Sequence, residues 1–229
     1  VEGRIDSQSL AADGVYLKGV DIAATVEGTN ENYTANGTAV AELFTFEDFR
    51  VELVKLAGNV RGTGTDFRWV GELQAAAAKT RSLTLGGLFL NDAVAELKDK
   101  ELTMAVGNGR AGKFSIAETE FANLYSRDLR VRYSPGTLSI TAPGATSASM
   151  TTPDFKLEGL KGQNLRVTDV GRTTRVHLDG LTADAATLKD NRARGVKADT
   201  FELTDVPERT DIRLGNLRAD TVTAPGTTI

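Results

Sequence analysis

Apolar and polar residues alternate along most of this chain, so that every second side chain is apolar. The alternation is clear in residues 49–53, 102–106 and 129–133, where Phe, Leu, Val, Met and Tyr are separated by Arg, Glu, Thr or Ala. It continues through residues 138–142, 165–167, 176–178, 201–203 and 212–214. A period of two is typical of β-strands that bury one face. The pattern therefore predicts an all-β protein.

A four-residue unit, apolar-x-(Gly or Asn)-apolar, interrupts this alternation at a fixed interval. One series of units starts at Leu85, Phe121, Leu157 and Ala193, each 36 residues after the last. A second series starts at Ala142, Leu178 and Leu214, with the same interval. The two apolar residues of a unit face one side only if the backbone bends between them, and Gly and Asn tolerate the positive φ of such a bend. The period predicts one structural unit stacked several times, with a crease in each long strand.

Turn-forming residues divide the repeat again. In the second half of the chain, Pro, Gly, Asp and Asn cluster near residues 135, 153, 171, 190, 208 and 225. One strand with its turn therefore takes about half of the 36-residue unit. The alanine run in residues 74–79 is the one helix-like stretch, but it is short, uncapped and flanked by strand patterns, so a helical turn is the less favoured alternative there.

Two architectures fit this interval. The first is an elongated, stacked β-repeat domain in which antiparallel creased strands fold into a jelly-roll-like trough. The second is a parallel β-solenoid with about 18 residues per rung and a corner at each Gly. The gaps between successive units alternate between 21 and 15 residues, which favours the antiparallel trough.

The chain is expected to form one domain. Residues 1–4, Val-Glu-Gly-Arg, resemble a protease-tag scar, so residues 1–9 are predicted to be a scar or a disordered N-terminus. Residues 10–229 are predicted to form a single elongated β-repeat domain. The first residue is Val1 and not Met, which is consistent with removal of a signal peptide or anchor and favours an exported protein.

Composition and charge narrow the function. The net charge is −4, from 27 basic and 31 acidic residues spread along the chain, so no nucleic-acid partner is expected. There is no Cys, which excludes a thiolate nucleophile and a Cys-ligated metal. No apolar run reaches the length of a transmembrane helix, about 18 residues, so no transmembrane segment is expected.

Catalytic residues are scarce, and the chain is predicted not to be an enzyme. His177 is the single histidine, and alternation with Val176 and Leu178 places it on the outer face of its strand. No Gly-x-Ser-x-Gly nucleophile elbow is present. We therefore expect an exposed strand histidine, no catalytic residues and no cofactor.

Two further motifs have a structural interpretation and a functional one. Asp184, Asp199 and Asp220 each follow an Ala and could form a calcium-binding ladder, but they lack the closely spaced glycines of known repeat calcium sites. A solvated or turn-capping role is favoured, and no metal site is predicted.

The glycine-rich residues 107–112 lack the Lys-Ser/Thr ending of a phosphate loop and are predicted to form a hairpin turn.

Aromatic residues gather in the first third of the chain. Trp69 and Phe67 form one group, and Phe44, Phe46 and Phe49 form another. Core packing or an end cap accounts for them, because a repeat stack needs its terminal apolar faces covered. The alternative is that they line a lipid-facing mouth.

Several short segments resemble the OstA-type domain of lipopolysaccharide-transport periplasmic proteins. Leu56-Ala57-Gly58-Asn59-Val60-Arg61 is similar to the recurrent L-x-G-N-V element of that family. Residues 181–186, 196–201 and 217–222 resemble its apolar-x-Ala-Asp-x-apolar element. The resemblance covers scattered pieces of residues 50–225. It implies a stacked antiparallel β-jelly roll whose apolar trough carries acyl chains across the periplasm.

These observations predict a non-enzymatic protein of the periplasm or cell envelope. Its expected function is to bind acyl chains in an apolar trough for lipid or lipopolysaccharide transfer. Six apolar residues near the creases are predicted to contact the acyl chain: Leu88, Leu102, Met104, Phe121, Ile140 and Leu157. Open strand edges predict end-to-end pairing with a similar strand or self-association. The alternative function is a structural or adhesive β-solenoid module that forms filaments or surface assemblies.

Overall fold

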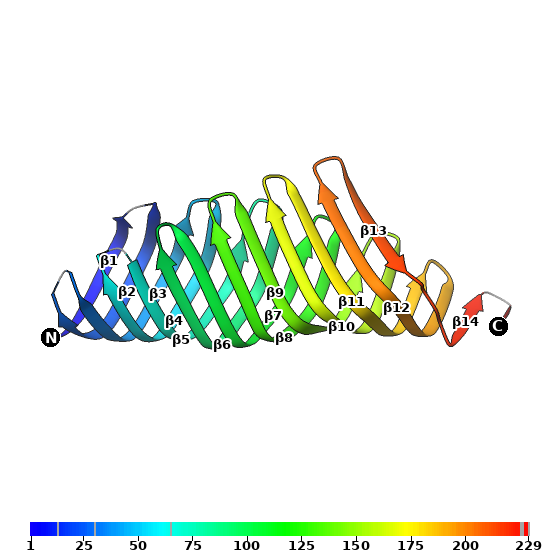
Figure 1. Cartoon of the computed structure of the whole chain (residues 1–229), viewed down its shortest axis with the longest axis horizontal. Helices are drawn as coiled ribbons and strands as arrows, with labels where there is room; N and C mark the ends of the chain where they lie inside the picture. The colour runs from blue at the N-terminus through cyan, green and yellow to red at the C-terminus, as the bar shows by residue number, and fades with distance from the viewer. Residues whose placement is uncertain (13, 30, 65, 225–226, 229) are drawn as a thin grey trace.

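The computed structural model describes residues 1–12, 14–29, 31–64, 66–224 and 227–228, and it is all-β over them (Figure 1). The strands are β1 (Glu2–Ala12), β2 (Val15–Gly28), β3 (Tyr33–Phe46), β4 (Phe49–Thr63), β5 (Asp66–Lys79), β6 (Leu83–Lys98), β7 (Glu101–Ile116), β8 (Thr119–Ser134), β9 (Thr137–Thr151), β10 (Phe155–Val170), β11 (Thr173–Leu188), β12 (Asn191–Val206), β13 (Arg209–Gly215), β14 (Thr221–Ala224) and β15 (Thr227–Thr228). Over these described ranges, no helix is long and apolar enough to cross a membrane.

The strands form one open antiparallel sheet in chain order. Each strand from β1 to β12 pairs with the strand before and after it, and β13 and β14 both pair with β12, one on each of its halves. The predicted antiparallel trough of creased strands is therefore confirmed, and the parallel β-solenoid is wrong because every pairing is antiparallel.

The hairpin turns follow the predicted interval. They lie at residues 99–100, 117–118, 135–136, 153–154, 171–172, 189–190 and 207–208, at steps of 18 residues. The turn expected near residue 225 lies outside the described residues.

Residues 74–79 are part of β5 and do not form the alternative helical turn, because Ala75 and Ala78 are buried against neighbouring strands, 6% and 1% exposed. Two local expectations differ from the structure. Residues 107–112 lie within β7 and not in a hairpin turn. The small glycines make room there, since a Cβ on Gly109 would lie 2.2 Å from the Cδ1 of Leu129. Residues 2–9, expected to be a scar or disordered, belong to β1, which pairs with β2 along its length.

The creases coincide with the repeat. In the first series, Gly87, Asn123, Gly159 and Gly195 all have positive φ, between 52° and 66°. In the second series, Gly180 and Asn216 have positive φ, but Gly144 does not. A third series was not expected from the sequence: Asp92, Asp128 and Asn164, with φ of 50° to 52°, again 36 residues apart. Strands β6, β8 and β10 therefore each bend at two positions, five residues apart.

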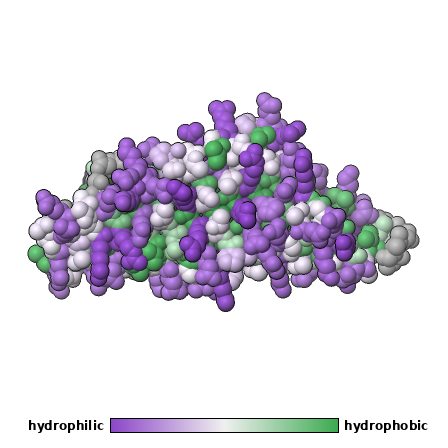
Figure 2. All heavy atoms as spheres, viewed as in Figure 1, coloured by the Kyte–Doolittle hydropathy of each residue, from purple (hydrophilic) through white to green (hydrophobic). Residues whose placement is uncertain are grey.

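Because the strands crease, the sheet folds over into two walls that meet along the crease (Figure 1). The half of the sheet that carries the turns at 99–100, 135–136, 171–172 and 207–208 is called the front wall. The rear wall carries the turns at 47–48, 81–82, 117–118, 153–154 and 189–190. Strands slope in opposite directions in the two walls. Hydrophilic side chains cover most of the face toward the viewer in Figure 2.

The slope offsets the two walls along the chain. Contacts between them join residues 85 to 89 positions apart, such as Asp48 with Tyr133 and Thr80 with Asp169. In these contacts, the rear-wall turns at 47–48 and 81–82 each face the end of a front-wall strand about five strands later. The largest buried cluster uses both walls and includes Phe121, Phe201 and Leu203. Two smaller clusters lie on the inner faces of the first strands, one around Val51 on the rear wall and one around Trp69 on the front wall.

Candidate functional site

An apolar chamber of about 170 Å³ lies between the walls, where the three clusters of buried residues approach one another. Front-wall strands contribute Leu102, Met104 and Ile140, and rear-wall strands contribute Phe49 and Phe121. Alternation places these side chains inside, because the polar residues between them point to solvent. The chamber is thus a direct product of the period-two pattern and the fold along the crease.

Five of the six residues predicted to contact an acyl chain line this chamber: Leu88, Leu102, Met104, Phe121 and Ile140. Leu157 does not line it. It is 2% exposed and packs in the largest buried cluster. The offset between the walls explains the difference, because it sets which rear-wall residues reach the chamber.

The sequence-based prediction missed further lining residues, which include Leu129, Val131, Leu165, Val167 and Val176. All of them belong to alternating segments that predicted strands. The alternation predicts that these side chains face inward, but it does not predict that they line the same chamber.

The hydroxyl groups at the chamber wall are already paired with the backbone. Ser126 Oγ donates a hydrogen bond to the Gly144 carbonyl oxygen at 2.5 Å. Ser147 Oγ donates to the Ala122 carbonyl oxygen at 2.7 Å. These groups are therefore satisfied within the sheet, and the surface left for a ligand is hydrocarbon.

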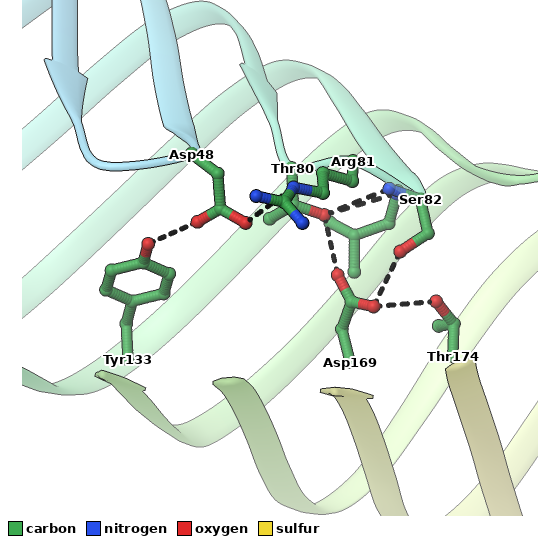
Figure 3. A network of polar contacts seen from close by, with 8 residues as sticks. Asp48, Thr80, Arg81, Ser82, Tyr133, Asp169 and Thr174 are labelled. Atoms are coloured by element: carbon green, nitrogen blue, oxygen red, sulfur yellow. Dashed lines mark hydrogen bonds and ion pairs between the residues drawn. The ribbon is translucent and has the colours of Figure 1, made fainter. Parts of the chain in front are cut away.

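A polar network joins the two walls beside the chamber, whose lining includes Phe49 and Tyr133; Figure 3 shows its contacts. At its first point, the Tyr133 hydroxyl on the front wall donates to Asp48 Oδ1 on the rear wall. Arg81, in the β5–β6 turn, lies with Nε 3.4 Å from Asp48 Oδ2. The Tyr133 ring also packs against Phe46 and Phe49, with centroids 5.7 Å and 5.9 Å away.

Asp169 forms the second point of this network. Its carboxylate accepts hydrogen bonds from Thr80 Oγ1 at 2.8 Å, Ser82 Oγ at 2.6 Å and Thr174 Oγ1 at 3.0 Å (Figure 3). Thr80 and Ser82 belong to the rear wall, whereas Thr174 is on the front wall beside Asp169. Asp169 is 8% exposed and Thr174 is fully buried. We call the Asp48 and Asp169 contacts together the mouth network.

Burial raises the pKa of the Tyr133 hydroxyl above its ordinary value, and the hydrogen bond to Asp48 raises it further. The phenol therefore stays protonated and remains a donor well above neutral pH. The hydrogen bond between Tyr133 and Asp48 is therefore not lost by ionisation of the phenol at physiological pH.

His177 is half-buried on the outer face of β11, not fully exposed as expected. Its Nε2 lies 2.9 Å from Asp179 Oδ1, and its Nδ1 lies 3.7 Å from Glu202 Oε1. Hydrogen bonds from Asn164 and then from His177 lower the pKa of Asp179. His177 thus makes a polar contact within β11, to Asp179, and a cross-strand one to Glu202 on β12.

The three aspartates considered for calcium do not meet. Asp199 accepts a hydrogen bond from Asn216 Nδ2 at 2.6 Å. Asp184 and Asp220 lie over the glycines of the crease, with Oδ2 atoms about 2 Å from where a Cβ of Gly159 or Gly195 would be. All three are exposed. Within the described part of the chain, no group of three acidic or histidine side chains is arranged to hold a metal ion.

The aromatic residues divide between core and chamber. Trp69 is 6% exposed in the front-wall cluster and Phe46 is 3% exposed beside Tyr133. Phe49 lines the chamber beside the mouth network.

Comparison with protein-family models, curated proteins and solved structures finds no match for this chain.

Proposed function

We propose that this protein binds acyl chains in the chamber between its walls, for lipid or lipopolysaccharide transfer in the cell envelope. The observation that carries the proposal is an apolar space whose wall hydroxyls already bond to the backbone. Such a surface selects hydrocarbon, because a buried polar group would find no free partner there.

The size of the chamber limits what it holds without movement. A volume of about 170 Å³ is below the roughly 300–1,000 Å³ of pockets for drug-sized ligands. It is close to an apolar cavity of about 150 Å³ that accepts benzene in another protein. A short hydrocarbon segment of about six carbons therefore fits, and a longer chain requires the walls to separate. Each buried CH₂ contributes about 0.8 kcal/mol of binding free energy, which favours separation of the walls around a longer chain.

The cellular setting is proposed from the sequence. The scattered OstA-like elements and the antiparallel creased strands are both consistent with a periplasmic lipid carrier. We propose no cofactor and no catalytic step. Transfer also needs a partner, and we propose that it pairs with the edge of β1. Among the described residues, β1 is paired on one side alone, with β2, and free strand edges pair readily with other strands.

Site-specific photo-crosslinking tests the proposal. A crosslinking residue in place of Met104 or Ile140 faces the chamber, whereas one in place of Lys161, between the two bends of β10, faces solvent. We expect the two inward positions to capture lipid from gently purified protein, and Lys161 to capture none. Native mass spectrometry of the same sample should show the lipid.

A chamber-filling variant gives an independent check. Ile140→Trp adds volume to a small space, so we expect it to reduce the captured lipid, while Lys161→Trp leaves it unchanged. Lipid absent from the mass spectrum and from every inward crosslink would remove the transfer function. The structural or adhesive function would then be the better proposal.

A further inference from the structure

The outer face of the front wall carries a cluster of arginines across β8 to β11. Strand register places Arg130 beside Thr141, which lies beside Arg166. In the next row, Arg132 lies beside Ser139, followed by Thr168 and Arg175. We call these four residues, Arg130, Arg132, Arg166 and Arg175, the arginine face. All four side chains are exposed.

This face carries more positive charge than its neighbours neutralise. Of the four arginines, Arg132 alone forms an ion pair within the described residues, with Nη2 2.7 Å from Glu101 Oε2. Among the surrounding acids, Glu96 pairs with Arg68, while Asp179 and Glu202 lie beside His177. The charge of Arg166 reaches Asp179 and contributes, after the Asn164 and His177 contacts, to lowering its pKa.

Short side chains make the face hollow beside two of the arginines. Thr103, Ala105, Ser139 and Thr141 form a depression of about 330 Å³ next to Arg130 and Arg132. Hydroxyl groups and guanidinium groups therefore border the same depression, together with the Glu96 carboxylate, which is paired with Arg68. This combination suits phosphate oxygens, because guanidinium and hydroxyl groups both donate hydrogen bonds to them.

The outer face of the rear wall differs at the same strands. Lys113 pairs with Glu120, and both Lys156 and Arg192 lie near Glu158, at 2.7 Å and 3.8 Å. There, basic side chains stand beside acidic ones. The two walls are thus both apolar on their inner faces, but the charge on their outer faces differs. The sequence repeat alone does not account for this difference.

We propose that the arginine face binds the phosphate groups of an anionic lipid bilayer, so that the front wall lies on the membrane surface. The four arginines span roughly 14 Å, at about 4.8 Å per strand, on a nearly flat sheet. This is wider than one phosphate and suits a planar array of headgroups. Nucleic acid fits less well, since the two rows named above contain no Phe, Tyr or Trp on which bases stack.

The net charge of the protein is −4, so an anionic bilayer repels the molecule as a whole. Any attraction to such a bilayer must therefore come from a local basic surface. Each Arg near such a surface contributes about 1 kcal/mol of attraction. The proposal does not depend on a lipid in the chamber, because the arginines face outward.

Vesicle co-sedimentation provides the test. We expect the full chain to bind vesicles of phosphatidylcholine mixed with phosphatidylglycerol and not vesicles of phosphatidylcholine alone, and higher salt should weaken the binding. The variant Arg130→Gln/Arg166→Gln/Arg175→Gln should bind about 100-fold more weakly, since three cations at about 1 kcal/mol each are lost and 1.4 kcal/mol is tenfold. The matched control, Lys113→Gln/Lys156→Gln/Arg192→Gln, removes the same charge from the rear wall and should bind like the wild type.

Two additions make the outcome decisive. Arg130→Lys/Arg166→Lys/Arg175→Lys keeps the charge and should retain most of the binding, with an unchanged melting temperature. Inorganic phosphate at constant ionic strength should not displace the protein, since a planar array is required. Equal binding to neutral vesicles, equal loss in the rear-wall control, or displacement by free phosphate would overturn the proposal.

Discussion

At the residue scale, the mouth network depends on two carboxylates that reach across the gap between the walls. Asp169 accepts three hydroxyl hydrogen bonds, two of them from the opposite wall. Asp48 accepts one from Tyr133. The three contacts between the walls join residues 85 to 89 positions apart, so these few polar groups help to fix how the walls meet.

Asp169→Ala should destabilise the fold. The substitution leaves the fully buried Thr174 hydroxyl and two rear-wall hydroxyls without their acceptor. An unsatisfied buried group costs about 1–3 kcal/mol, which should lower the midpoint of urea unfolding. Asp169→Asn keeps one acceptor oxygen and should lose less. Asp154→Ala, in an exposed turn, is the matched control and should change the midpoint little; an equal effect of both alanine variants would contradict this role of Asp169.

Tyr133 should give the protein an alkaline limit. Burial and the Asp48 hydrogen bond raise its pKa in the folded state above the ordinary value of 10.0. The protonated phenol therefore contributes stability that is fully present below pH 10 and is lost as the pH rises through the folded-state value. Tyrosinate absorbance should show a late-ionising phenol in the wild type that Tyr133→Phe lacks. Identical alkaline titration curves of the folded wild type and Tyr133→Phe, apart from amplitude, would argue against the raised pKa.

At the element scale, the strands bend where the sequence repeat supplies Gly, Asn or Asp. The first-series creases are 36 residues apart and lie on alternate strands, β6, β8, β10 and β12. A crease that recurs in register lets the whole sheet fold along one line. Bending is thus a property of the stack and not of single strands.

Gly180→Ala isolates the cost of a crease. Gly180 has φ of 55°, and nothing lies within 4 Å of an added Cβ, so the substitution strains the backbone without a clash. A non-glycine residue in this region costs about 1–2 kcal/mol. Gly112→Ala is the matched control within a strand, because its φ is not positive and its Cβ would make an ordinary contact of 3.5 Å with the Gly86 carbonyl oxygen. We expect a lower melting temperature for Gly180→Ala alone. If the two variants melt together, positive φ does not define the crease.

At the scale of the whole molecule, the offset between the walls determines both the chamber and the ends. The rear-wall turns at 47–48 and 81–82 meet the ends of front-wall strands about five strands later, so the middle of the stack is covered on both sides. The first strands keep separate inner clusters on each wall. The chamber lies where those clusters approach the central core.

The free edge of β1 should support concentration-dependent association. Ile5 is 53% exposed on this strand, whereas Val40 is 44% exposed on β3, which has strands on both sides. A Lys on an edge strand opposes pairing with other chains. We expect light scattering to show an apparent mass that rises with concentration for the wild type and Val40→Lys, and less so for Ile5→Lys. A wild type that stays monomeric at all concentrations would exclude edge pairing.

Much of the fold follows from the sequence alone, because its signals are local. Alternation determined the strands and the face that each one buries. The glycines and asparagine at positions 87, 123, 159 and 195 determined where strands bend, since positive φ is a property of single residues. The alanines of residues 74–79 left a helical turn open as an alternative, and the structure places them in a strand, where burial between neighbours outweighs their helix propensity.

The tertiary structure alone decided which distant residues meet. The slope of the strands sets the offset of 85 to 89 residues, and no short segment encodes that number. It therefore decided that Leu157 packs in the core while Leu88 and Ile140 line the chamber, and that Asp169 faces Thr80 and Ser82. It also gathered four arginines from three strands, far apart in sequence, onto one outer face. Local preference shapes each strand, whereas the geometry of the folded sheet creates the sites.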